Sequence, residues 1–165
     1  MFTTISDYPS VTDRATDIGL RHPSGIAILP INFDSAQDQE QLLQRSEAAT
    51  VRSLLRQAKM PPDELLPRPK TLGFIQNNSF EWVGPIIFFS ASLFSNSPDV
   101  FAVVINVLSN YLTDFFKGVS GTKNVKLKVV IETTPGGTCK MVSFDGPLEA
   151  LGDIRNVIKE INRES

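Results

Sequence analysis

Cysteine and histidine are almost absent from this sequence, and their scarcity limits the chemistry it can carry. The 165 residues include one cysteine, Cys139, and one histidine, His22. A lone cysteine cannot form an internal disulfide, and a structural zinc ion needs four Cys or His ligands. A cysteine–histidine catalytic pair would have to join these two residues from opposite ends of the chain. We therefore expect a protein of a reducing, cytoplasmic environment that uses no metal or cofactor.

A secretion signal and a strong charge imbalance are also lacking. Residues 1–17 contain no basic start followed by an apolar stretch, which a signal peptide requires. The net charge is -2 and hydrophobic residues make up 41% of the chain, both close to the values of globular proteins. These features argue against export, intrinsic disorder and a fibrous structure.

What the sequence does contain is the pattern of a single α+β domain over residues 1–165. We predict about three helices packed on a mixed or antiparallel sheet. The predicted order is an N-terminal strand and helix (1–60), a proline-rich connector (61–69), an apolar core segment (70–117) and a β-hairpin followed by a helix (125–162).

The N-terminal strand is predicted from Gly25 to Phe33, an apolar run rich in β-branched residues. Pro30 within it lacks a backbone donor, which places the strand at an edge of the sheet or at a bulge. A helix is predicted from Ser35 to Lys59, because Ser35 and Asp38 have capping-box spacing and basic residues gather near its end. Prolines then end this helix and begin an extended connector.

Charge is scarce in the centre of the chain, from Thr71 to Phe116. This segment has three acidic residues, no Lys or Arg, and eight of the chain's eleven phenylalanines, so we predict that it forms the core. Within it, Pro85–Phe94 fits a buried strand or a short helix, and we favour the strand. A largely buried helix is predicted next, with Ser97 as its N-cap and Gly118 at its end.

The C-terminal third predicts a hairpin and a helix. Two strands, Val125–Thr133 and Thr138–Phe144, flank a turn that contains two glycines. Apolar residues alternate with lysines along the first strand, a pattern typical of a sheet with one solvent-exposed face. The helix begins near Gly146, and its apolar stripe should pack on the hairpin. That stripe comprises Leu148, Leu151, Ile154, Ile158 and Ile161.

No group of polar residues forms a catalytic motif, which favours a non-enzymatic protein-interaction or regulatory module. Such a module would bind a protein partner or a second copy of itself, as one subunit of a larger bacterial assembly. Phe74, Phe80 and Trp82 lie in or near an irregular polar segment, so they are the aromatic residues most available for an exposed patch. We predict these three as the partner-binding residues.

A cluster of lysines is the most suggestive charge pattern. Residues 117–140 hold five lysines and a single acid, Glu132. Four of the lysines are candidate anion-binding residues: Lys123, Lys126, Lys128 and Lys140. The alternative is that lysines on the solvent-exposed face of a hairpin protect a sheet edge from pairing with other chains. The chain is acidic overall and no aromatic residues interleave with these lysines, which argues against nucleic acid as a partner.

Two other functions are left open by the sequence. A small hydrolase would use loop carboxylates near Asp34 together with His22, since catalytic groups often lie in loops at strand ends. A membrane-associating protein would use the apolar segment 82–116. Each apolar run in that segment is shorter than the roughly twenty residues that span a bilayer, which argues against membrane insertion.

Overall fold

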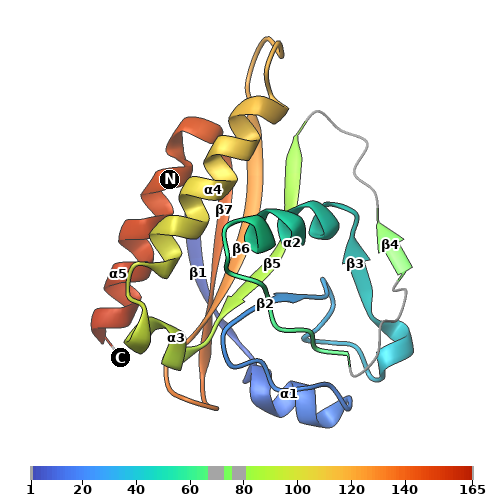
Figure 1. Ribbon diagram of the computed structural model, residues 1–165. Coiled ribbons are helices and arrows are strands. Elements are labelled where there is room, and N and C mark those ends of the chain that lie inside the picture. The colour runs from blue at the N-terminus through green and yellow to red at the C-terminus, as the bar shows by residue number, and fades with distance from the viewer. Residues whose placement is uncertain (1, 67–72, 76–80, 165) are drawn as a thin grey trace.

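The computed structural model describes residues 2–66, 73–75 and 81–164 (Figure 1). The strands are β1 (Thr3–Tyr8), β2 (Ile26–Leu29), β3 (Leu43–Arg45), β4 (Gly73–Ile75), β5 (Trp82–Phe89), β6 (Asn124–Glu132) and β7 (Cys139–Pro147). The α-helices are α1 (Val11–Asp17), α2 (Glu47–Gln57), α3 (Ala91–Asn96), α4 (Val100–Phe115) and α5 (Ile154–Glu164). Two 3-10 helices are η1 (Gln39–Gln41) and η2 (Leu148–Asp153). The predicted α+β class is confirmed.

Five strands form the central sheet in the order β1-β7-β6-β5-β2. Strands β5 and β6 are parallel, and the other neighbouring pairs are antiparallel, so the sheet is mixed. Strands β3 and β4 form a separate parallel pair. The α3–α4 segment connects the two parallel strands, as a parallel pair requires.

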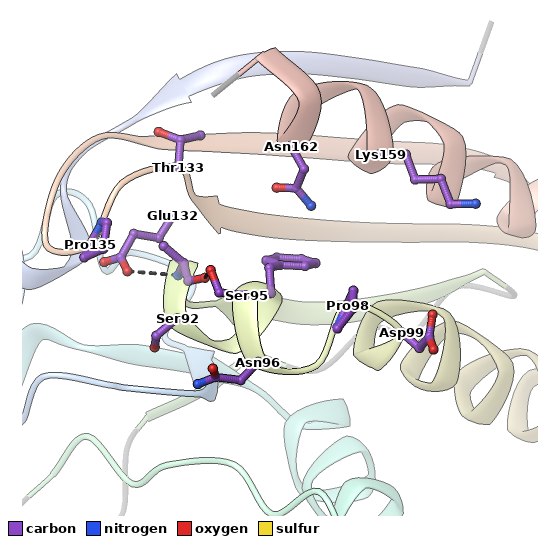
Figure 2. A pocket seen from close by; sticks show the side chains of 12 residues that line it. Ser92, Ser95, Asn96, Pro98, Asp99, Glu132, Thr133, Pro135, Lys159 and Asn162 are labelled. Carbon is purple, nitrogen blue, oxygen red and sulfur yellow. Dashed lines mark hydrogen bonds between the residues drawn. The ribbon is translucent and has the colours of Figure 1, made fainter.

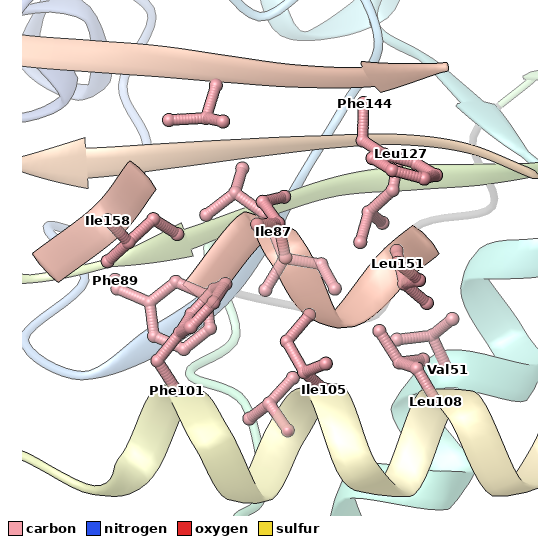
Figure 3. Close-up of a cluster of buried hydrophobic side chains, with 14 of the residues drawn as sticks. Val51, Ile87, Phe89, Phe101, Ile105, Leu108, Leu127, Phe144, Leu151 and Ile158 are labelled. Atoms are coloured by element: carbon pink, nitrogen blue, oxygen red, sulfur yellow. The ribbon is translucent and has the colours of Figure 1, made fainter. Parts of the chain in front are cut away.

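The two faces of the central sheet are covered unequally. Helices α2, α4 and α5 pack on one face, where α4 and α5 lie side by side (Figure 1). Figure 3 shows the resulting core, in which Phe101, Ile105 and Leu108 of α4 face Ile87 and Leu127 of the sheet. A smaller core on the opposite face is closed by α1 and the loops that follow it. The larger core therefore holds α2, α4 and α5 in place, and the smaller core anchors the N-terminal region.

The predicted hairpin and the helix after it are present, but β7 continues through Gly146 and Pro147, where the helix was expected to begin, and α5 starts at Ile154 after the 3-10 helix η2. Strands β6 and β7 pair in register from Asn124↔Pro147 to Glu132↔Cys139. Alternate residues of β6 face the larger core, because the side chains of a strand point to opposite faces in turn. The predicted apolar stripe of the last helix is buried against the sheet at Leu151, Ile154, Ile158 and Ile161.

The central segment contains both of the structures considered for Pro85–Phe94. The favoured strand is present and ends at Phe89, after which Ser90 caps helix α3. The predicted long helix is confirmed as α4, although Asp99 and not Ser97 occupies its N-cap position. None of the helices in the described residues combines the length and apolar character needed to cross a bilayer.

The helix predicted from Ser35 to Lys59 is wrong over its first half, since α2 begins only at Glu47. The Asp38 side chain accepts hydrogen bonds from the backbone N–H groups of Glu40 and Gln41, so its capping signal serves the short helix η1. The chain is then extended in β3, where the buried Gln44 amide donates to the Leu29 carbonyl oxygen at 3.1 Å. The tertiary contact of Gln44 thus outweighs the local helix signal in this segment.

The N-terminal region adds elements that the sequence pattern did not reveal. Strand β1 and helix α1 precede the predicted strand, and β1 is exposed along most of its length. Strand β2 ends at Leu29, directly before Pro30, and lies at an edge of the sheet as predicted. Residues 61–66 of the predicted connector contain no helix or strand beyond one bridge at Asp63, and residues 67–69 lie outside the described part of the chain.

Candidate binding cleft

A cleft of about 790 Å³ opens at the carboxyl ends of the parallel strands β5 and β6. Its walls are helix α3, the start of α4, the turn after β6 and helix α5 (Figure 2). In open sheets, ligands bind preferentially at the carboxyl ends of parallel strands, because connections leave a crevice there. The residues that line the cleft are Ala91, Ser92, Phe94, Ser95, Asn96, Pro98, Asp99, Glu132, Thr133, Pro135, Lys159 and Asn162.

Glu132 is the buried charged residue of this cleft. It is the last residue of β6, and it is only 6% exposed. Its Oε1 atom accepts a hydrogen bond from the Ala91 backbone N–H at 3.0 Å (Figure 2). Among the described side chains, no cation forms an ion pair with this carboxylate. A buried carboxylate with one backbone donor keeps further capacity to accept hydrogen bonds.

The backbone beside Glu132 is fixed by Ser90, which is 2% exposed. The Ser90 hydroxyl donates to the Ser24 carbonyl oxygen at 2.8 Å and accepts from the Leu93 N–H at 3.2 Å. These bonds connect the end of β5 to the loop before β2 and to the first turn of α3. The start of α3, and with it the Ala91 N–H, is therefore held in place.

The rest of the cleft combines an aromatic ring with charges near the rim. Phe94 is partly buried and its ring centroid lies 5.7 Å from that of Phe89. Asp99 and Lys159 are exposed and come from different walls (Figure 2). The cleft thus contains two carboxylates and one ammonium group. This arrangement favours a cation deep in the cleft, near Glu132, with an apolar surface for its stem.

Of the predicted partner-binding residues, only Trp82 has a described side chain. It is 2% exposed and belongs to the larger core, so it does not contribute to an exposed patch in this structure. Phe80 lies outside the described residues, and for Phe74 only the backbone, in β4, is described. A partner-binding role for Phe74 and Phe80 stays a prediction.

The four candidate anion-binding lysines are not gathered at one point. Lys126 and Lys128 share a face of β6, whereas Lys140 lies on the opposite face of the hairpin, as the strand alternation and register place it. Lys126 forms an ion pair with Glu81 at 3.3 Å, and Lys140 forms one with Asp7. Lys123 precedes β6 and is half-buried. Anion binding at these lysines stays a prediction.

The residues considered for catalysis are placed separately. The His22 Nε2 atom lies 2.7 Å from the Thr16 hydroxyl oxygen, and Asp34 is exposed in a loop. No hydrogen bond or ion pair joins His22 to Asp34 in the described part of the chain. Burial raises the pKa of the Cys139 thiol to about 11, so at neutral pH it is protonated and a poor nucleophile.

Glu132 was not among the predicted site residues, although one signal in the sequence pointed to it. It is the only acid among the lysines of residues 117–140, and it follows directly on the apolar run Val129–Ile131. An acid at the end of a buried strand is unusual, because a buried charge requires partners. Position alone did not reveal that the start of α3 would cover it.

No protein-family model, no curated protein and no solved structure matches this chain. A function for this chain can therefore be proposed only from the geometry of the cleft and the chemistry of the residues that line it.

Proposed function

We propose that this chain is a non-enzymatic protein-interaction module whose cleft receives a cationic side chain, arginine or lysine, of a partner protein. The observation that carries the proposal is the burial of Glu132 in an open cleft without an ion-pair partner among the described side chains. A regulatory role as a subunit of a larger assembly is the broader form of the same proposal.

The chemistry of Glu132 favours a cation over a neutral ligand. Burial removes the carboxylate from water, and a charge held in this way is stabilised when a cation supplies hydrogen bonds. A guanidinium group is well suited, since it offers several donors in a planar fork that matches a carboxylate. The Phe94 ring supplies an apolar surface for the stem of such a side chain.

The size and lining of the cleft favour a peptide segment as the source of the cation. A volume of about 790 Å³ holds more than one side chain. Short polar side chains on the walls can bond to the backbone of a bound segment; they are Ser92, Ser95, Asn96 and Thr133. Lys159 on the opposite wall would repel a second cation, and so would favour a partner with a single basic residue at this point.

The proposal is tested by an NMR titration with N-acetyl-arginine amide and, as a neutral isostere, N-acetyl-citrulline amide. We expect the arginine probe to shift the amide resonances of Ala91, Ser92 and Thr133. The citrulline probe should bind with a dissociation constant at least tenfold higher. The expected ratio follows from the roughly 1.5–3 kcal/mol carried by a hydrogen bond to a charged group. Recovery of the probe unchanged would accord with binding without catalysis.

Two variants separate the role of the charge from the role of the fold. Glu132→Gln keeps an acceptor for the Ala91 N–H but removes the charge, so it should stay folded and lose the preference for arginine. Asp99→Asn, at the exposed rim, should change affinity by only a few-fold, as exposed ion pairs do. Equal binding of the two probes by the unmodified protein, or an arginine preference that survives in Glu132→Gln, would contradict the proposal.

A further inference from the structure

Strand β1 leaves one edge of the central sheet open. Residues Thr4 to Asp7 are all exposed, and no described segment pairs with the outer side of this strand. Natural proteins usually protect such an edge with lysine, proline, a bulge or a covering loop. The β1 sequence TTISDY contains none of these residue types, and its pairing with β7 is regular.

The backbone of β1 presents a regular row of unpaired groups along this edge. Asp145 N–H donates to the Phe2 carbonyl oxygen at 2.9 Å, which identifies Phe2 as a residue whose polar backbone groups face β7. In an antiparallel pair these groups face the two sides of a strand in turn. The N–H and C=O groups of Thr3, Ile5 and Asp7 therefore point outward. The pairing of β6 with β7 gives the same assignment. One alternate set of β7 residues bonds to β6, and the other set, which includes Asp145, is left to bond to β1.

We propose that two copies of this chain pair through β1, antiparallel and about a two-fold axis at Ile5. In that register Ile5 exchanges both of its hydrogen bonds with Ile5 of the second copy. Thr3 of each copy then pairs with Asp7 of the other, so all the outward groups of these three residues are satisfied. The two five-stranded sheets become one continuous sheet.

The side chains of β1 suit a second copy as the occupant of this edge. Ile5 is 52% exposed, and the two-fold register brings the two isoleucines directly opposite each other, where each removes the other from water. Asp7 is the one charged residue of the strand, and its ion pair with Lys140 offsets that charge. Opposite Asp7, the Thr3 hydroxyl of the other copy can donate a hydrogen bond.

The first test is the mass of the protein in solution, measured by light scattering across a concentration series. We expect the unmodified chain to form dimers at high concentration, Ile5→Lys to remain monomeric, and Thr4→Lys to dimerise. Thr4 is the matched control, because it is exposed on the same strand while its backbone groups face β7. A chain that stays monomeric at millimolar concentration would overturn the proposal and leave the edge to a strand of another protein. Dimers that survive Ile5→Lys would overturn it as well.

The second test fixes the register by disulfide formation. In a hydrogen-bonded antiparallel pair the opposed Cα atoms lie about 5.5 Å apart, within the range that a disulfide spans. Ile5→Cys should therefore give a covalent dimer on mild oxidation, whereas Thr3→Cys should not, since the two Thr3 positions lie far apart in this register. Cys139 is 2% exposed and should not cross-link in either variant. Cross-linking through Thr3→Cys but not Ile5→Cys would overturn the register.

Discussion

At one edge of the central sheet, β2 is buried at all four of its residues, whereas at the other edge β1 is exposed from Thr4 to Asp7. Both strands contain residues that favour extended structure, so strand propensity does not explain the difference. The difference lies in what flanks each strand. Segment 61–65 runs along β2, and nothing comparable in the described residues runs along β1.

The covered edge depends on Asp63. Its backbone N–H donates to the Ile26 carbonyl oxygen at 2.7 Å, and its Oδ2 atom accepts from the N–H groups of Ser24 and Gly25 at 2.8 and 3.0 Å. Nearby, the Gln44 amide donates to the Leu29 carbonyl oxygen. One edge of the sheet thus contributes to the stability of the monomer, and the other remains available for pairing. Three substitution pairs probe this contrast.

Truncation of one side chain on each edge strand should give the largest difference. Leu29 is 0% exposed and packs in the smaller core, so Leu29→Ala should lower the free energy of unfolding by about 2–5 kcal/mol. Ile5→Ala removes a half-exposed side chain and should cost less than about 1 kcal/mol in the dilute monomer. Urea denaturation of both variants at low protein concentration measures the two values. Comparable losses would contradict the contrast between the edges.

Removal of the Asp63 carboxylate should have a smaller effect. Asp63→Ala leaves the Ser24 and Gly25 N–H groups without their acceptor, and we expect a loss of about 2 kcal/mol in the free energy of unfolding. The neighbouring acid Glu64 is itself exposed and forms ion pairs with Arg52 and Arg56, so Glu64→Ala should cost less than about 1 kcal/mol. An equal effect of the two substitutions would show that Asp63 does not hold the covered edge.

The smallest effect concerns the charge of the open edge. A hydrogen bond from Lys140, aided by its positive charge, holds the pKa of Asp7 below its ordinary value. A lowered pKa stabilises the folded state above the unfolded-state pKa of about 3.9, and that contribution is lost as the pH falls through the folded-state value. Lys140→Ala should therefore raise the Asp7 titration midpoint, followed by carboxyl-carbon NMR. Lys128→Ala, on the other face of the hairpin, should leave it unchanged.

Periodicity predicted the parts of the fold whose local pattern and tertiary environment agree. Helix α4, the β6–β7 hairpin and the stripe of α5 are apolar at the spacing their structures require. The segment Ser35–Arg45 was mispredicted as helix because the Asp38 side chain caps only the short helix η1, and because the Gln44 amide bonds to the Leu29 carbonyl oxygen, which only the fold brings near. Strand β1 carries no buried alternation, since both of its faces are largely exposed, so its sequence gives no core signal.

The candidate cleft was less predictable than the fold. Its residues come from α3, the start of α4, the end of β6 and α5, which are distant in the sequence. The isolated acid Glu132 was visible among the lysines, but its bond to the Ala91 N–H depends on the parallel pairing of β5 and β6. Clefts formed by such non-local pairing leave no short motif in the sequence.

The contrast between the two edges, and the pairing inferred for β1, are tested most directly by amide hydrogen exchange at increasing protein concentration. In dilute solution the amides of Thr4 and Ser6 should be protected by their bonds to β7, while those of Thr3, Ile5 and Asp7 exchange rapidly. At high concentration the second group should become protected as β1 pairs with β1. Rapid exchange of Thr3, Ile5 and Asp7 at every concentration, or their protection already in dilute solution, would contradict the account.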